Sequence, residues 1–243
     1  MRCLLLAGLL ALSVLPGRAD SIASARLAQA RLGPTVWSRV IRIENSRPDP
    51  HHPKEFAALV FAVEDRLWLY NPYEGTQSLS LLAGHLSDDE ADPGPLLRAA
   101  LPGLRRWVAF SDPPSSAAAK DAAKSAREAT LPFGCFIECY CRWRELVASG
   151  RDFSAASVLV FYFDTSIGPV GHSVLLLQTA TGRLMYDPNE NATMPVGTAG
   201  ASALEIARTI FALENPFRAH LLELHPPETA ASNRMPSGRH AEM

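Results

Sequence analysis

The sequence predicts an α+β fold on the basis of two observations. Segments with strand character follow one another across short turns, as in antiparallel sheets, in residues 56–70 and again in residues 171–187. Helical segments interrupt these strands without alternating with them one for one, which argues against a parallel α/β sheet. We find no internal repeat in the sequence. We therefore expect residues 20–225 to form a single α+β domain.

Residues 1–19 have the pattern of a secretory signal peptide. Met1-Arg2 is a short positive segment, Cys3 to Leu15 is almost continuously apolar, and Gly17-Arg18-Ala19 places small residues at a cleavage site. The apolar run is shorter than the roughly 20 residues of a membrane-spanning helix, and no later run is longer. An N-terminal anchor or a buried helix is the alternative. We expect a periplasmic or secreted protein that does not span the membrane after cleavage.

The N-terminal half is expected to be mainly β-structure. A short helix over residues 20–32 ends at a Gly-Pro pair, and a strand over residues 36–44 follows it. After a proline-rich loop, residues 56–70 form the clearest hairpin. This β-hairpin region, residues 36–84, is expected to extend or cover the sheet of the C-terminal half.

Residues 85–131 are less regular. An acidic loop opens this stretch, and residues 95–110 predict a short helix and a strand. A proline break then leads to an alanine-rich helix that ends near residue 130 and has little apolar face.

The C-terminal half has clearer signals, and it ends in a polar tail over residues 226–243 that we expect to be disordered. The expected elements are a buried helix at 135–149, a buried strand at 156–163, a hairpin of strands 171–178 and 183–187, an amphipathic helix at 203–213 and a strand at 217–224.

The charge balance is close to neutral, with 23 Lys and Arg against 25 Asp and Glu and a formal net charge of −2. Nucleic-acid binding would call for a basic stripe, which is absent from the sequence. We therefore do not expect nucleic acid as a partner.

Three of the four cysteines lie within "PFGCFIECYCRW", residues 132–143. An odd number in a mature exported chain leaves at least one thiol free or one intermolecular disulfide. Zinc sites usually combine two separated ligand pairs, and no second cysteine pair follows. A metal-binding module is thus the weaker alternative, and we expect neither a metal nor a cofactor. Cys139 and Cys141 have the context of small core residues.

Cys135 differs from the other two because Pro132 and Gly134 place it at the start of the helix. Unpaired N–H groups and the helix dipole stabilise a thiolate there. A thiol nucleophile also needs a nearby base and a group that orients that base. His172 begins the strand "GHSVLLLQ" and is the candidate base, and Asp187 ends the next strand, "RLMYDPN".

The register of this hairpin decides whether the two side chains can meet. If "TATG" is a four-residue loop, Gln178 pairs with Arg183, and Asp187 then lies on the face of His172, two residues away diagonally. In the same register Asn189 pairs directly with His172, so Asn189 is the alternative orienting residue.

Residues 130–190 resemble the papain-like cysteine-protease fold, most closely its transglutaminase-like and bacteriocin-peptidase-like (C39-like) branches. The resemblance implies a papain-like core over residues 130–224. It also implies that Cys135 is the nucleophile, His172 the general base and acid, and Asp187 the orienting group. Peptidases of this kind often carry a glutamine shortly before the nucleophile, and residues 125–134 contain none. The N–H of Cys135 and the side chain of Gln77 are the substitutes we consider.

We therefore expect an exported cysteine-dependent acyl-transfer enzyme, a peptidase, amidase or transglutaminase-like protein, acting on a protein or peptide. The alternative is a non-catalytic papain-fold module for binding or assembly in the cell envelope.

Overall fold

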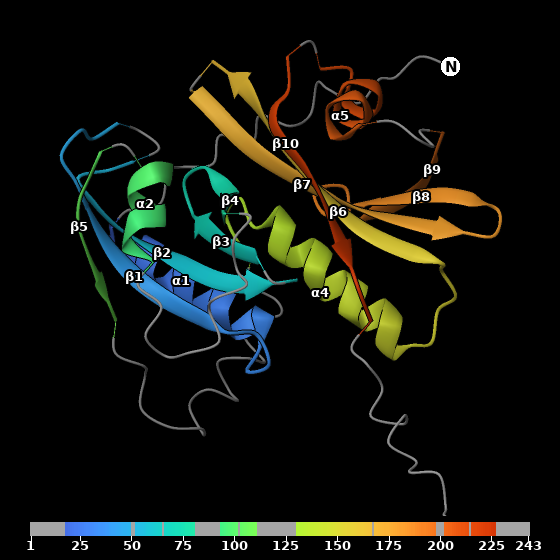
Figure 1. Cartoon of the computed structure of the whole chain (residues 1–243), viewed down its shortest axis with the longest axis horizontal. Coiled ribbons are helices and arrows are strands. Elements are labelled where there is room, and N and C mark those ends of the chain that lie inside the picture. The colour runs from blue at the N-terminus through green and yellow to red at the C-terminus, as the bar shows by residue number, and fades with distance from the viewer. Residues whose placement is uncertain are drawn as a thin grey trace, which may run out of the picture.

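A computed structural model describes residues 18–49, 52–64, 66–80, 93–101, 103–110, 130–166, 168–197, 202–213 and 215–226. Within these ranges the chain forms two five-stranded antiparallel sheets and four helices (Figure 1). The prediction of an α+β fold is confirmed. The expected signal sequence before Arg18, most of the acidic loop, the alanine-rich helix and the tail beyond residue 226 lie outside the described residues.

The first sheet belongs to the N-terminal half, in the strand order β4-β3-β2-β1-β5. The elements of this half are α1 (Arg18–Leu32), β1 (Ser38–Asn45), β2 (Glu55–Val63), β3 (Arg66–Asn71), β4 (Gly75–Ser80), α2 (Gly94–Ala100) and β5 (Leu104–Ala109). These strands form a sheet of their own, so they do not extend the sheet of the C-terminal half.

The second sheet belongs to the C-terminal half, in the strand order β10-β6-β7-β8-β9. The elements of this half are α4 (Cys135–Ala148), β6 (Ala155–Thr165), β7 (Gly168–Thr179), β8 (Gly182–Asp187), β9 (Ala192–Val196), α5 (Ala203–Phe211) and β10 (Phe217–Leu224). The predicted helix, hairpin and terminal strand of this half are all present, with ends shifted by a few residues at most.

The two halves repeat one arrangement, so the expectation of no internal repeat is wrong for the structure. Each half runs helix, four strands, helix, strand, and the two sheets have matching strand orders. The register matches as well, because Leu59 pairs with Tyr70 in the first half and Leu175 pairs with Tyr186 in the second. Each tyrosine is followed by an Asx-Pro pair, Asn71-Pro72 or Asp187-Pro188.

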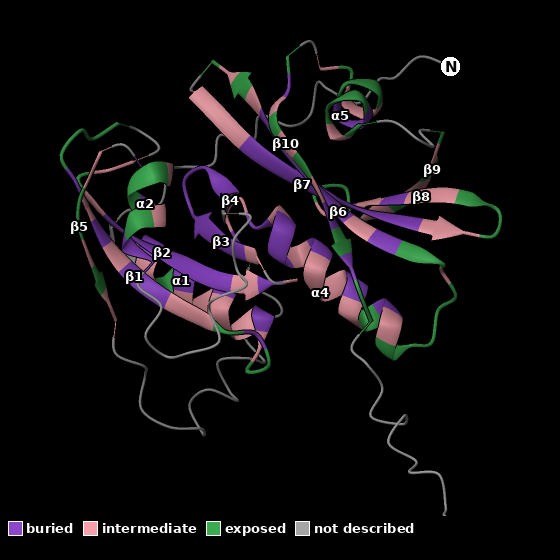
Figure 2. Ribbon diagram, viewed as in Figure 1, coloured by how far each residue is buried: buried purple, intermediate pink, exposed green. Residues whose placement is uncertain are grey.

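The main core lies between the two sheets, and α4 runs through it (Figure 1). Phe136 of α4 packs against the N-terminal sheet, with ring centroids 5.6 Å from Phe61 and 4.6 Å from Trp68. Cys139 and Trp143 belong to the same core, together with β6 and β7 residues. Figure 2 shows buried positions along the central strands of both sheets and on α4. This packing fixes the start of α4 between the two halves.

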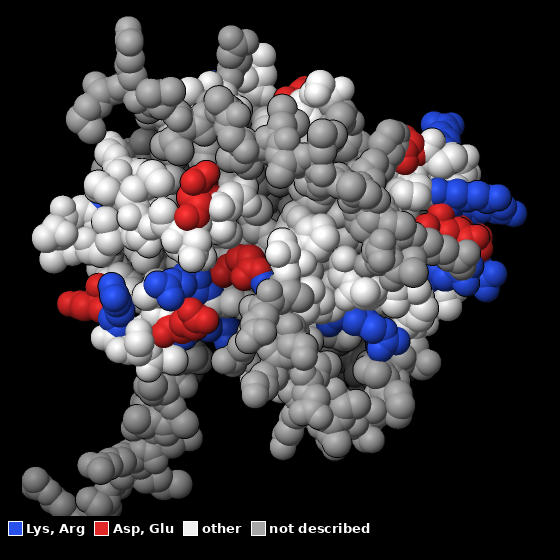
Figure 3. All heavy atoms as spheres, turned by 180° about the vertical axis from the view of Figure 1, so that it is seen from behind, with Lys and Arg blue, Asp and Glu red and all other residues white. Residues whose placement is uncertain are grey.

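Two smaller hydrophobic cores lie on the outer faces of the sheets. One is between the first sheet and α2, and the other is between the second sheet and α5. The sequence sets the start of α5 through a capping box, because the Ser202 side chain accepts from the N–H of Glu205 and the Glu205 carboxylate accepts from the N–H of Ser202. Among the described helices none has the length and hydropathy to cross a membrane. On the face shown in Figure 3, acidic side chains lie beside most of the basic ones.

Candidate functional site

The loop before α4 holds Cys135 at the first position of the helix, as the sequence predicts. Phe133 has a left-handed backbone, with φ of 50°. Gly134 caps the helix, and a Cβ there would lie 2.4 Å from Cδ2 of Leu131, so only glycine fits. The loop is tied to the other half, because Tyr70 of β3 donates a hydrogen bond of 2.6 Å to the carbonyl of Pro132.

Cys135, His172 and Asp187 come together in one chain of contacts. The Nδ1 atom of His172 lies 3.3 Å from Sγ of Cys135. On the other side of the ring, Nε2 lies 3.4 Å from each carboxylate oxygen of Asp187. The helix supplies the thiol, β7 supplies the imidazole and the end of β8 supplies the carboxylate.

His172 is held in an aromatic slot. Its ring stands perpendicular to Phe161, with centroids 5.6 Å apart, and to Phe211, with centroids 5.3 Å apart. Burial alone would disfavour the imidazolium, but the charge of Cys135 and the hydrogen bond to Asp187 outweigh it and raise the pKa of His172 to about 10. The site therefore favours a protonated imidazole facing the sulfur.

Asp187 is fixed from two directions. Besides His172, the backbone N–H of Asn189 donates to its Oδ1 at 2.9 Å. Burial would raise the pKa of Asp187, but the hydrogen bond and charge of His172, with the backbone N–H groups of Asn189 and Glu190, lower it. Asp187 is consequently ionised at neutral pH.

The hairpin has the register that the sequence predicts, with Gln178 opposite Arg183. Thr179 and Gly182 also pair, so the loop contains two residues rather than four. The register is the same for both loop lengths, so each side chain stays on the predicted face of the sheet. The ladder of β7 with β8 ends at Leu175 and Tyr186, before the position where Asn189 would pair with His172.

The carboxylate of Asp187, rather than the Asn189 side chain, therefore lies at Nε2 of His172. The Oδ1 atom of Asn189 lies 3.4 Å from Sγ of Cys135, in an exposed contact. This contact is not among the sequence-based predictions. The signal that could have suggested it is the position of Asn189, two residues after Asp187.

Gln77 is not brought to Cys135. It lies on β4, opposite Leu69, and lines a second cavity that is separate from the one at Cys135. The cavity at Cys135 has a volume of about 400 Å³, and its polar lining includes Glu138, Asn189 and Asn191. Arg31 and Glu138 both line this cavity and form an ion pair with each other.

The other two cysteines of the cluster point elsewhere. Cys139 is fully buried, with Sγ 3.5 Å from the carbonyl of Ser173, and burial raises its pKa well above the usual value. Sγ of Cys141 lies 3.4 Å from the carbonyl of Arg31 on α1. Within the part of the chain that the structure describes, no group of three His, Cys, Asp or Glu side chains is arranged to hold a metal ion.

The N-terminal half does not reproduce these contacts. By register, Phe56 stands where His172 stands in the second half, and Asn71 stands where Asp187 stands. Phe56 instead packs at right angles against Tyr73, with centroids 5.9 Å apart. The thiol, imidazole and carboxylate are combined at the C-terminal half, and the N-terminal half supports them through Tyr70.

Neither protein-family models, nor curated proteins, nor solved structures give a match to this chain. What the site does is therefore inferred from its own residues.

Proposed function

We propose that the protein is a cysteine-dependent acyl-transfer enzyme, of peptidase, amidase or transglutaminase-like type, with Cys135 as nucleophile. The observation that carries this proposal is the unbroken contact from Cys135 Sγ through the His172 ring to Asp187. A nucleophile, a base within reach and a buried group that orients the base are the requirements of covalent acyl transfer.

In the first step the Cys135 thiolate attacks the carbonyl carbon of an amide, and a sulfur–carbon bond forms. The protonated His172 gives its Nδ1 proton to the leaving amine as the carbon–nitrogen bond breaks, which leaves a thioester. In the second step water or another amine attacks the thioester. His172 accepts the proton of the attacking group, and the acyl group leaves Cys135 as an acid or a new amide.

Two donors are suited to stabilise the oxyanion of the intermediates. The N–H of Cys135 lies at the start of α4, where helix geometry leaves the first N–H groups without intrahelical partners. The side-chain amide of Asn189 is the second, because a half-turn of this group presents Nδ2 where Oδ1 now lies. Asn189 thus replaces Gln77 in this proposed role.

The proposal includes a papain-like core over residues 130–224. It is supported by the chain order Cys135, His172, Asp187 and by a buried helix that packs its cysteine end against an antiparallel sheet. The polar lining of the cavity at Cys135 suits a peptide or protein substrate. An extracytoplasmic location is part of the same proposal, and it is supported by the signal-like pattern of residues 1–19.

A covalent intermediate tests the proposal directly. The protein is mixed with p-nitrophenyl acetate, and release of p-nitrophenolate is followed beside the intact mass and the peptide map. We expect a stoichiometric burst with the acetyl group on the Cys135 peptide. Cys135→Ala abolishes the burst, whereas the matched variant Cys141→Ala keeps it. Asn189→Ala slows acylation by about 100-fold. Absence of an acetyl group on Cys135 would contradict the proposal.

A non-catalytic binding module of the cell envelope is the second candidate. It is favoured by the N-terminal half, which keeps the same framework with Phe56 and Asn71 at the positions of His172 and Asp187. This candidate predicts no acyl-enzyme and no difference between Cys135→Ala and the unaltered protein in that experiment.

A further inference from the structure

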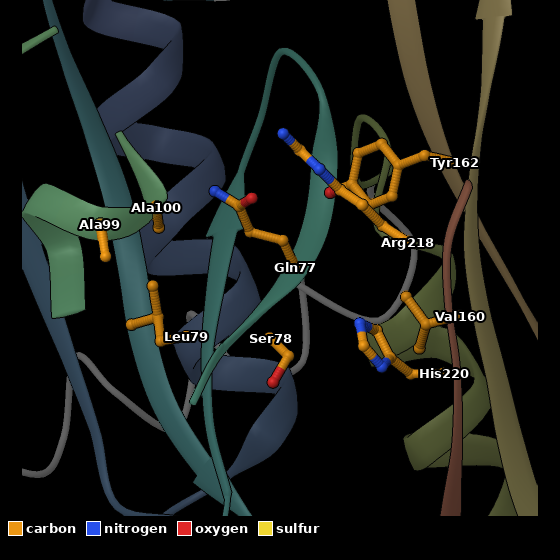
Figure 4. A pocket seen from close by; sticks show the side chains of 9 residues that line it. All are labelled: Gln77, Ser78, Leu79, Ala99, Ala100, Val160, Tyr162, Arg218 and His220. Atoms are coloured by element: carbon orange, nitrogen blue, oxygen red, sulfur yellow. The ribbon is translucent and has the colours of Figure 1, made fainter. Parts of the chain in front are cut away.

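A second cavity, with a volume of about 280 Å³, lies between the two halves (Figure 4). The N-terminal half lines it with residues of β4 and α2, and the C-terminal half with residues of β6 and β10. None of its lining residues belongs to the cavity at Cys135. It is therefore a separate site, and the proposed activity does not account for it.

Two buried polar atoms at this cavity have no hydrogen-bond partner among the described residues. They are Nε2 of Gln77 and the hydroxyl of Tyr162. Tyr162 is 1% exposed and Gln77 is 8% exposed. A buried polar group without a partner destabilises the fold, and such groups deserve a specific explanation. Neither atom is exposed to water in this structure, so a ligand in the cavity would supply the missing partners after these side chains shift toward it.

Arg218 reaches the same cavity from a distorted part of β10. The pairing of β10 with β6 shifts register between Phe217 and His220, and Arg218 has a left-handed φ of 47°. Bulges and unfavourable backbone angles concentrate at functional positions. In Figure 4 the Arg218 side chain extends past Tyr162 toward Gln77. Its guanidinium carbon lies 5.5 Å from the centroid of the Tyr162 ring.

Glu74 holds Arg218 in position through an ion pair. Nη1 of Arg218 lies 3.5 Å from Oε1 of Glu74, which is 3% exposed, and Oε2 of Glu74 lies 3.0 Å from Nε2 of His52. The Arg218 side chain itself is half exposed. One end of the guanidinium is thus held by Glu74, and the Arg218 side chain also lines the cavity.

The lining determines the chemical class of ligand. Burial and the nearby Arg66 lower the pKa of His220, so this histidine is neutral at pH 7. Among the described lining residues, Arg218 carries the one permanent charge and none is acidic. A guanidinium fork matches the two oxygens of a carboxylate, and an amide and a hydroxyl match a second polar group.

We infer that this cavity binds a small molecule with a carboxylate group, with Arg218 holding the carboxylate and Gln77 and Tyr162 binding its other polar atoms. The volume lies near the lower end of the range for ligand pockets, which suits a molecule the size of an amino acid.

Calorimetric titration of the full chain tests this inference with N-acetylalanine, N-acetylalaninamide and inorganic phosphate as probes. We expect N-acetylalanine to bind with a Kd of about 1 mM or tighter. The uncharged amide should bind at least about tenfold more weakly, since it lacks the carboxylate. Equal binding of acid and amide, no saturable binding of the acid, or tighter binding of phosphate would each overturn the inference.

Variants separate a binding role from a structural one. Tyr162→Phe and Gln77→Leu remove the two atoms without partners, so each should keep or raise Tm while weakening N-acetylalanine binding about tenfold. Arg218→Asn removes the charge, and asparagine tolerates the left-handed backbone at this position. This variant should also weaken N-acetylalanine binding about tenfold. Arg151→Asn, at an exposed arginine outside the cavity, is the matched control. Binding within twofold of wild type in all three variants would overturn the assignment.

Discussion

Tyr70 of the N-terminal sheet donates a hydrogen bond of 2.6 Å to the carbonyl of Pro132, three residues before Cys135. Tyr70 is fully buried and Pro132 is half-buried, so this bond is partly withdrawn from water. The two halves are therefore joined at the loop that begins α4. Through this contact the N-terminal half supports the loop that carries the thiol of Cys135.

Replacement of Tyr70 by phenylalanine should loosen that loop. Tyr70→Phe keeps the ring but leaves the Pro132 carbonyl without this donor, so we expect the free energy of unfolding to fall by about 1–2 kcal/mol. Urea denaturation measures the change. Tyr140→Phe, at a half-buried tyrosine on α4, is the control and should change stability by less than about 0.5 kcal/mol. Equal stabilities for Tyr70→Phe and wild type would show that the bond does not hold the loop.

Gly171 marks a second contact between the halves. A Cβ at this position would lie 2.9 Å from Cζ of Tyr162 and 3.0 Å from the carbonyl of Glu74, which also accepts a hydrogen bond from the Gly171 N–H. Gly171→Ala should therefore destabilise the fold by about 1–3 kcal/mol. Gly197→Ala, where a Cβ meets nothing within 4 Å, is the control. Thermal and urea unfolding of both variants measure the difference, and similar stabilities would contradict the close approach.

Asp187 is expected to act by orienting His172. Asp187→Asn keeps the shape but offers the ring an uncharged partner, so acyl transfer should fall by about 10³- to 10⁴-fold. The rate of p-nitrophenolate release in steady state measures it. Asp164→Asn, at an exposed aspartate on β6, should leave the rate unchanged. A loss of less than about tenfold for Asp187→Asn would mean that another residue orients the imidazole.

The protonation of His172 provides a prediction of pH dependence. Because its pKa in the fold is about 10 and that of a free histidine is about 6.5, the imidazolium should persist at neutral pH and be lost only as the pH approaches 10. Taken alone, this group contributes stability that is complete below pH 6.5 and is lost as the pH rises to about 10.

Titration by ¹⁵N NMR of the imidazole rings measures this value. In Cys135→Ala the pKa of His172 should fall, because the charge of Cys135 is the strongest influence that raises it. His220, whose pKa is lowered by burial, is an internal comparison in the same spectra. A His172 that titrates near pH 6.5 in both proteins would rule out the charged pair.

Much of the fold could be predicted from the sequence because local signals were strong. Gly134 marked the start of α4, and β8 was bounded by the turn at Gly182 and by Asp187-Pro188. The side-chain period of two made the hairpin register predictable even though the loop is shorter than expected. These local features were sufficient to bring His172 toward Asp187.

The remaining features depend on contacts between distant segments. The sequence does not reveal the repeat because the halves share strand order and a Tyr-Asx-Pro turn but few identical residues. The contact of Asn189 with Cys135 arises where the chain leaves β8, beyond the ladder that fixes register. The position of Gln77 depends on how the two sheets pack around α4, which the sequence of either sheet does not determine.

The rate of alkylation of Cys135 measures directly whether His172 activates this thiol. Iodoacetamide is added at pH 7, and the modified peptides are quantified by mass spectrometry over time in wild type and in His172→Ala. We expect Cys135 to react at least about tenfold faster than a free model thiol, because the imidazolium stabilises the thiolate. His172→Ala should abolish this advantage, while the buried Cys139 stays unmodified in both proteins. A Cys135 that reacts no faster than the model thiol, or equally fast in both proteins, would show that His172 does not activate it.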